Sequence, residues 1–170
     1  MSPPPGDDRR NDPIREAHRQ WVAHGWDDAA DGMAMVTSLI RVQQLLLERI
    51  DAVLRPLELT FARYEVLMLL SFSRSGSLSM ARIGSLLQVH PTSATSAVAR
   101  LEAQGWVERS RSEADGRVVL ASVTEAGRAV AARATEGLNR EVFSRPGLGP
   151  DQVVRLAALL EEHRRAAGDL

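Results

Sequence analysis

Apolar residues recur at three- and four-residue intervals along most of the chain, which is the spacing of one face of an α-helix. The pattern predicts helices over residues 14–23, 28–54, 61–72, 80–87, 91–104, 125–143 and 151–166. Proline or a capping side chain marks the start of most of them, at Pro13, Thr60, Ser79, Pro91, Thr124 and Asp151. Two stretches with strand-like alternation, 106–111 and 117–122, predict a hairpin around the polar loop 112–116. The expected fold is mainly α-helical with one small β-hairpin.

The helix predicted over 28–54 is apolar on two faces. One stripe comprises Met33, Val36, Ile40, Leu47, Ile50 and Leu54, and the other comprises Leu39, Leu46 and Val53. Such a helix packs against its own domain on one face and against a further partner on the other. In the helix over 61–72, the predicted core residues are Tyr64, Leu67 and Met68, with Phe72 at the end of the same face.

Residues 80–104 predict two helices separated by a tight turn at Gln88-Val89-His90, and the hairpin follows directly. This order is typical of a winged helix-turn-helix, whose second helix enters the DNA major groove and whose hairpin reaches the flanking backbone or minor groove. Helical spacing assigns one face of the second helix to the core. That face comprises Ala94, Ala97, Val98 and Leu101.

The opposite face of the second helix consists of hydroxyl groups and one arginine. Its residues are Thr92, Ser93, Thr95, Ser96 and Arg100. Short hydroxyl side chains let a helix lie close to a groove and donate to phosphates or base edges. The free backbone amides from Pro91 onward also favour a phosphate. Serine and threonine are common at any exposed helix start, but the hairpin that follows favours DNA binding.

The hairpin supplies positive charge. Arg109 and Arg111 lie on its first strand, and Arg117 lies just past its tip. Asp115 is placed to hold the Arg117 guanidinium in a bidentate contact. One such arginine would be an ordinary solvated side chain, whereas three within nine residues indicate a basic wing.

The composition is that of an ordinary globular protein, with 170 residues, 44% hydrophobic and 25% charged. The chain has no cysteine, which excludes disulfide frameworks, zinc ribbons, iron–sulfur clusters and thiol chemistry. No apolar run is long enough to span a bilayer, and the Pro-, Asp- and Arg-rich segment 1–11 predicts a disordered tail, not a secretory signal. We therefore expect a cytoplasmic, nucleoid-associated protein without membrane contact.

The net charge of −1 by itself argues against a nucleic-acid partner. Its distribution changes that conclusion. Residues 1–58 hold seven basic and ten acidic residues, 59–128 hold eight and six, and 129–170 hold six of each. All 21 basic residues are arginine, which suits planar contacts with phosphates and base edges. The small positive excess over 59–128 predicts weak non-specific binding and a dependence on two wings acting together.

Four motifs follow one another in the second half of the chain. They are Met80-Ala-Arg-Ile-Gly-Ser-Leu-Leu-Gln-Val89, Arg100-Leu-Glu-Ala-Gln-Gly-Trp-Val-Glu-Arg109, Asp115-Gly-Arg117 and Val123-Thr-Glu-Ala-Gly127. Together they resemble the MarR family of bacterial transcription regulators over roughly residues 60 to 128, and the flanking helices agree in order and length. Two departures are Ala99, where the family often has an acidic residue, and Glu113, which adds a negative charge to the wing.

The resemblance implies a homodimer in which the terminal helices of two chains interlock and two winged helices bind one pseudo-palindromic operator in double-stranded DNA. It implies a transcription regulator, with repression as the family default. The implied domains are a tail and short helix over 1–27, a dimerisation helix over 28–58, a winged helix-turn-helix over 59–128 and C-terminal dimerisation helices over 129–170. It places Thr92, Ser93, Thr95, Ser96 and Arg100 at the major groove and Arg117 in the minor groove.

Family members often lose DNA affinity when a small aromatic acid or phenol binds between the dimer helices and the winged helix. Candidates for such a ligand pocket are Trp21, Trp26, Met33, Met35, Arg63 and Tyr64, with core and interface packing as the competing interpretation of the apolar ones. The four histidines are scattered without ligand spacing, so no metal site and no cofactor are expected.

Two alternatives from other functional classes remain. A winged-helix module for protein–protein contacts, without DNA binding, would fit the near-neutral charge. An enzyme is the weaker alternative, because the sequence contains no Ser/His/Asp order, phosphate loop or metal triad.

Overall fold

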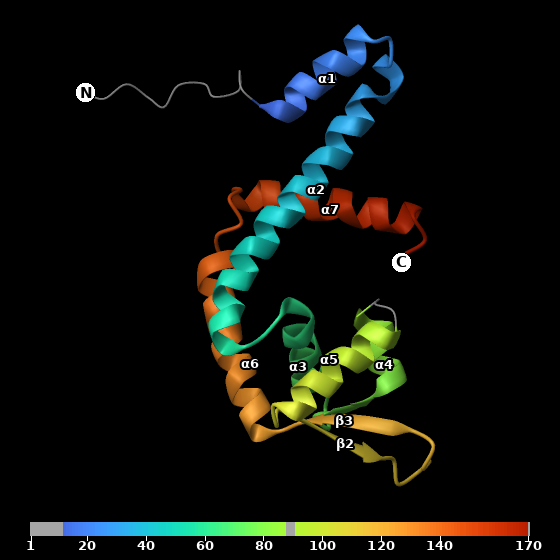
Figure 1. The fold of residues 1–170 in the computed structure, drawn as a ribbon, viewed down its shortest axis with the longest axis vertical. Coiled ribbons are helices and arrows are strands. Elements are labelled where there is room, and N and C mark those ends of the chain that lie inside the picture. The colour runs from blue at the N-terminus through green and yellow to red at the C-terminus, as the bar shows by residue number, and fades with distance from the viewer. Residues whose placement is uncertain (1–11, 88–90, 170) are drawn as a thin grey trace, which may run out of the picture. The chain divides into compact units, whose positions relative to one another are not determined.

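The computed structural model describes residues 12–87 and 91–169. Its elements are α1 (Pro13–Ala23), α2 (Asp27–Leu54), α3 (Phe61–Phe72), β1 (Ser77–Ser79), α4 (Met80–Leu87), α5 (Pro91–Ala103), β2 (Val107–Arg111), β3 (Val119–Val123), α6 (Glu125–Leu138) and α7 (Pro150–Ala166) (Figure 1). A 3₁₀ turn, Arg55–Leu57, follows α2, and a π-helical turn, Asn139–Phe143, follows α6. The mainly helical fold with a small hairpin is confirmed. The predicted turn at residues 88–90 lies outside the described residues.

The chain divides into two compact units, residues 1–48 and 49–170. In the first unit, α1 and the start of α2 form a helical hairpin. Gly25 allows the reversal because its φ is 77°, a conformation that other residues rarely adopt. The rings of Trp21 and Trp26 meet edge-on with centroids 5.2 Å apart, and His18 Nε2 lies 2.8 Å from Asp31 Oδ1. These contacts hold the two helices of the hairpin together.

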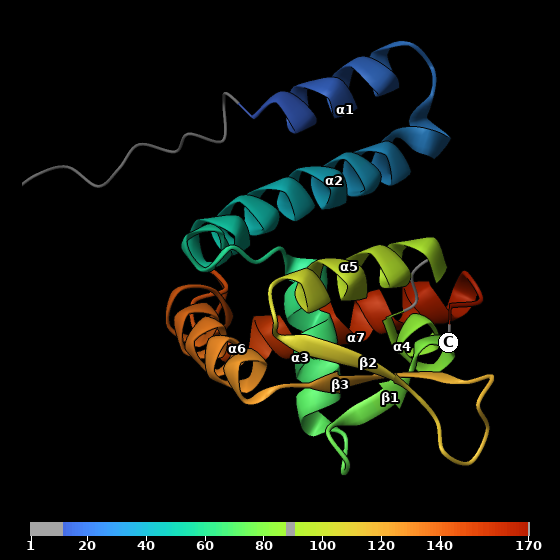
Figure 2. The same ribbon diagram turned by 60° about the horizontal axis from the view of Figure 1, so that its bottom comes forward.

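The second unit has α3 at its centre, where it contacts α4, α5, α6 and the sheet (Figure 2). Its core consists of aliphatic side chains with almost no solvent exposure: Leu54, Val66, Leu67, Leu70, Ile83, Val98, Leu101, Val107 and Leu138. The end of α2 joins this core through Leu54. Arg49 adds a polar tie, because its guanidinium donates to the carbonyl oxygens of Glu141 (2.5 Å) and Arg145 (2.8 Å).

The sheet has three antiparallel strands in the order β1-β3-β2. The hairpin register pairs Arg109 with Ala121, and β1 pairs with the far edge of β3. No strand was predicted where β1 lies, because three residues are too few to show alternation. The second hairpin strand was predicted from Arg117 but begins at Val119. The backbone N–H of Val118 donates to the Asp115 carbonyl over 2.9 Å, so these residues form the turn.

Most predicted helix starts are confirmed. Thr60, Ser79 and Thr124 accept hydrogen bonds from backbone N–H groups of their helices' first turns at 3.4, 3.2 and 3.0 Å. Asp151 was predicted to cap the last helix, which is wrong. The helix begins at Pro150, and Gln152 closes its start by accepting from the N–H of Gly149 at 2.9 Å.

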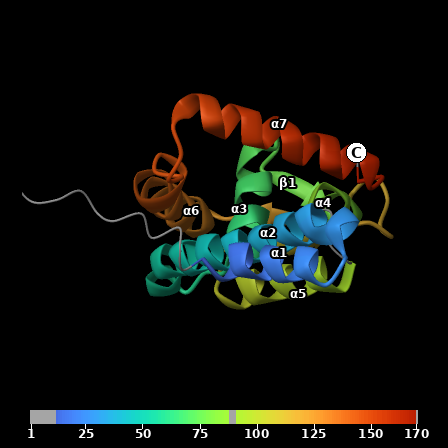
Figure 3. The same cartoon turned by 90° about the horizontal axis from the view of Figure 1, so that it is seen from above.

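One apolar prediction differs from the structure. Phe72 was predicted on the core face of α3 but is 78% exposed, because it is the last residue of the helix and extends beyond the core. The buried residues of α3 are Tyr64, Val66, Leu67 and Leu70. Helix α7, at the top of Figure 3, buries none of its residues. Val154 remains 70% exposed. Its apolar face is therefore uncovered within the described chain. No helix within the described ranges is long and apolar enough to cross a membrane.

Candidate nucleic-acid interface

Helix α5 presents a polar face to solvent because its opposite face is anchored in the core. Ala94, Val98 and Leu101 are buried at helical spacing, as predicted, while Ala97 is half-buried. The predicted contact residues are all exposed: Thr92, Ser93, Thr95, Ser96 and Arg100. Pro91 is the first residue of the helix. The two faces predicted from the sequence are confirmed.

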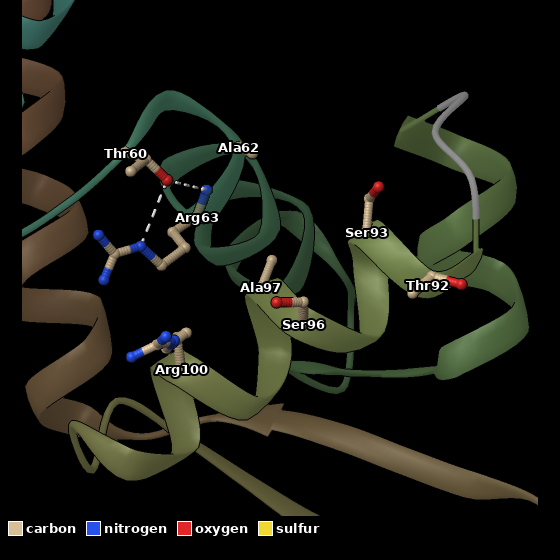
Figure 4. Close-up of a pocket in the computed structure, with 8 residues that line it drawn as sticks. All are labelled: Thr60, Ala62, Arg63, Thr92, Ser93, Ser96, Ala97 and Arg100. Atoms are coloured by element: carbon tan, nitrogen blue, oxygen red, sulfur yellow. Dashed lines mark hydrogen bonds between the residues drawn. The ribbon is translucent and has the colours of Figure 1, made fainter.

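One side of α5 forms a hollow of about 530 Å³ with the start of α3 (Figure 4). Ser93, Ser96 and Arg100 line it from α5, and Arg63 of α3 and the preceding cap residue Thr60 line it from the other side. Two cationic side chains and several hydroxyl groups therefore meet beside the outer face of α5. An arrangement of this kind suits an anion.

Arg63 is held in this hollow by neutral acceptors. Its Nε lies 3.3 Å from the Thr60 hydroxyl, and one terminal nitrogen donates to Gln104 Oε1 over 3.1 Å. The amide nitrogen of Gln104 in turn donates to the Glu58 carbonyl at 3.3 Å. The positive charge of Arg63 therefore stays uncompensated by an ion pair within residues 12–87 and 91–169.

The other side of α5 forms a second hollow with the wing and the start of α4. Thr95 from α5 and Arg109 and Arg117 from the hairpin line it together. The structure thus brings predicted residues of the helix and the wing to one place. Arg111 is exposed at the end of β2, apart from that hollow.

Arg109 is paired with a carboxylate that sequence reasoning left out. Its guanidinium donates twice to Glu102 on α5, with Nε 2.8 Å from the carboxylate oxygen. The hydrogen bond from Arg109 lowers the pKa of Glu102 and keeps that group ionised. The sequence did contain a signal for this pair, because Glu102 and Arg109 lie seven residues apart on either side of the Gly105 turn. The pair links α5 to β2, the first strand of the wing.

Asp115 has a different role from the predicted one. Its carboxylate accepts from the backbone N–H of Arg117 at 3.0 Å and does not pair with the guanidinium. Asp115 therefore shapes the wing turn, because a short carboxylate caps the N–H group two residues further on. The guanidinium groups of Arg111 and Arg117 have no ion-pair partner within the described ranges, so their positive charges stay uncompensated.

The Thr-x-x-Gly motif fastens the wing to α6. The hydroxyl of Thr124 donates to the Gly105 carbonyl at 2.9 Å, and its backbone N–H donates to the Trp106 carbonyl at 3.1 Å. A Cβ on Gly127 would lie 2.1 Å from that same Trp106 carbonyl oxygen. Only glycine fits here, so the motif positions the start of β2 and the arginines that follow.

The residues predicted to line a ligand pocket fall in both units. Trp21, Trp26 and Met33 belong to the first unit, and Arg63 and Tyr64 to the second. Tyr64 is buried and its hydroxyl lies 3.0 Å from the Thr135 hydroxyl, as a core tyrosine does. The ligand pocket stays a prediction. The described residues contain no group of three or more His, Asp or Glu able to hold a metal ion.

An exposed second helix and a wing bearing arginines define a winged helix-turn-helix DNA-binding protein. The MarR family model matches residues 57–118. An HTH-type transcriptional repressor of Mycobacterium tuberculosis is 35% identical over 105 residues, which cover 62% of this chain and 74% of that protein. The chain belongs to the MarR family and is a DNA-binding transcription regulator.

Two solved structures from Streptomyces coelicolor show the same fold. The MarR family regulator Sco5413 is 43% identical with a TM-score of 0.74, and the match covers 82% of this chain and 97% of that one. The MarR family regulator Sco3205, solved in complex with DNA, is 27% identical with a TM-score of 0.72, covering 81% and 88%. Both regulators are therefore similar to this chain over most of its length.

Proposed function

We propose that the protein is a transcriptional repressor that binds as a homodimer to a pseudo-palindromic operator in double-stranded DNA. The observation that carries this proposal is the outer face of α5, which is exposed, free of acidic side chains and flanked by arginines on both sides. A helix with short side chains lies close to base edges in the major groove. The wing then reaches the flanking minor groove with Arg117.

The homodimer is supported by the uncovered apolar residues of α7. Val154 and Leu159 are 70% and 62% exposed, and Leu156 and Leu160 also reach solvent. A helix with such a face is stable when a second copy covers it. Two linked winged helices that bind one operator together also have a higher overall affinity than either alone, which compensates for the modest positive charge of each. The predicted release by a small aromatic or phenolic effector stays a prediction.

The test begins with selection of bound fragments from a random duplex library, followed by footprinting. We expect two half-sites separated by about one helical turn, roughly 10 base pairs. Arg117→Gln should weaken binding and reduce the salt dependence, because each lost phosphate contact lowers the slope of log K against log salt by about 0.9. Arg133→Gln is the matched control, since Arg133 is exposed on α6 and lines neither of the two hollows beside α5.

Two outcomes would contradict the proposal. If no duplex is retained at low salt, the winged helix serves protein–protein contacts instead. If a single half-site is protected by a monomer, the homodimer is wrong while DNA binding stands.

A further inference from the structure

Arg63 is the long cationic side chain that α3 contributes beside α5. It lies in the first turn of α3, outside the helix-turn-helix and the wing, yet it lines the same hollow as Arg100 (Figure 4). The figure shows both guanidinium groups at the same end of the hollow. The interface therefore extends beyond the elements that define a winged helix.

Neither arginine is neutralised. The hydrogen bonds of Arg63 go to a hydroxyl and an amide oxygen, which orient the guanidinium without cancelling its charge. Arg100 has no ion-pair partner within the described ranges. Asp51 and Glu58 line an adjoining hollow that Arg63 also lines, but neither comes within ion-pair distance of Arg63. Two like charges facing one hollow repel each other, and an anion between them removes that repulsion.

We propose that Arg63 and Arg100 together bind one backbone phosphate of the operator, at the edge of the major groove that α5 enters; this rests on the proposed DNA-binding function. The guanidinium fork suits a phosphate because it donates two parallel hydrogen bonds. Ser96, one helical turn before Arg100, lines the same hollow and adds a hydroxyl donor. The hollow is also open beside the outer face of α5, where a DNA strand would run.

A shared phosphate contact makes Arg63 a positioning residue for the recognition helix, not a reader of sequence. A phosphate carries no base information, so Arg63 should contribute equally to all duplexes. This property separates the proposal from a role in base recognition. It also separates it from the predicted effector pocket, where loss of Arg63 would leave DNA binding intact.

The experiment measures duplex binding by fluorescence anisotropy across a salt series, with the full-length chain. The variants are Arg63→Gln, Arg100→Gln, the double variant and the control Arg133→Gln, each on the selected operator and on a scrambled duplex of equal length. We expect Arg63→Gln to weaken both duplexes by the same several-fold factor. The slope of log K against log salt should shrink by about 1.8, because each protomer of the dimer loses one phosphate contact worth about 0.9. The control should match the wild type.

The double variant tests whether the phosphate is shared. Once Arg63 is gone, removal of Arg100 should cost less than it does alone, because the two losses act on one contact. A thermal melt checks each fold. If Arg63→Gln melts early, Arg63→Lys takes its place, and the lysine should keep the salt slope while losing affinity.

The proposal is overturned if Arg63→Gln binds like Arg133→Gln, or if the losses from Arg63 and Arg100 multiply independently. It is also overturned if Arg63→Gln weakens only the selected operator. Failure of the wild type to bind any duplex would instead overturn the proposed function, so the two failures are distinguishable.

Discussion

Gly127→Ala tests whether the Thr-x-x-Gly motif is dictated by the close approach of α6 to the start of the wing. A Cβ at Gly127 would lie 2.1 Å from the Trp106 carbonyl oxygen and 3.0 Å from its carbon. An ordinary contact requires that carbonyl to move by more than an ångström. The carbonyl is not free to move, because it accepts the backbone N–H of Thr124 at 3.1 Å. The substitution should therefore disturb the joint between α6 and β2.

Two opposing effects set the change in the free energy of unfolding that Gly127→Ala should cause. Replacing glycine by alanine inside a helix stabilises it by about 1 kcal/mol. Overpacking against a fixed neighbour costs about 1–3 kcal/mol, and a backbone neighbour places Gly127 at the upper end. The net loss should be about 1–2 kcal/mol, which lowers the Tm of a chain this long by about 2–8 °C. DNA affinity should fall as well, because β2 carries Arg109 and Arg111.

Two glycines of the same unit provide matched controls. Gly84 in α4 has nothing within 4 Å of the position that a Cβ would take, so Gly84→Ala should leave the Tm unchanged or raise it. At Gly137 the new methyl would lie 2.7 Å from one methyl of Val53, so the contact is longer than at Gly127 and involves a side chain instead of the backbone. The Tm of Gly137→Ala should therefore lie between those of Gly127→Ala and Gly84→Ala. The assay is thermal unfolding followed by circular dichroism at one protein concentration, since dimerisation makes the Tm concentration-dependent.

The reasoning is refuted if Gly127→Ala melts at or above the wild type in the same series as Gly84→Ala. That result would mean that the Trp106 carbonyl yields without cost. Glycine in the motif would then need another explanation than the contact with the wing.

Three further predictions concern the wing, the core and the dimer. Glu102→Gln should lower the Tm at pH 7 and weaken DNA binding, because it removes the tie to Arg109. The pKa of Glu102 is held below its ordinary 4.5, so the pair stabilises above that pH and the difference from wild type should vanish as pH falls below it. Tyr64→Phe should cost about 1 kcal/mol in urea unfolding, since a buried hydrogen bond to Thr135 is lost; a neutral result would show that the bond contributes nothing. Val154→Glu should convert a dimer to a monomer in light scattering, and an unchanged mass would exclude α7 from the interface.

The helices and the two faces of α5 were predictable because their signals are local. Ala94, Val98 and Leu101 recur at helical spacing, and a threonine or serine precedes several helices. The predicted arginines of the wing also fall on or beside the hairpin. What the sequence shows poorly is pairing across distance. The Glu102–Arg109 pair depends on the tightness of the Gly105 turn, and the approach of Arg63 to Arg100 depends on how α3 packs under α5.

The same limit explains the wrong predictions. Phe72 continues the apolar spacing of α3, but the helix ends there and nothing in the described chain covers its last residue. Asp115 has the right spacing for a contact with the Arg117 guanidinium, but the tight turn brings the backbone N–H closer than the side chain. In both cases the local spacing was correctly recognised, but the group that the side chain was expected to contact is not the one that lies beside it in the fold.

The surface of α5 restricts how an operator can be recognised. Apart from Arg100, its exposed outer side chains are short, at Thr92, Thr95 and Ser96. If Arg100 binds a phosphate, no long side chain of this face remains to form a bidentate contact with guanine. Direct readout then rests on hydroxyl groups and on contact of threonine methyl groups with thymine. The remaining specificity must come from DNA shape, and the wing offers a means, since arginine prefers the narrow minor groove of A·T-rich sequence. A chain of nearly neutral charge can bind DNA selectively in this way, because a few well-oriented arginines on two wings replace a broad basic surface.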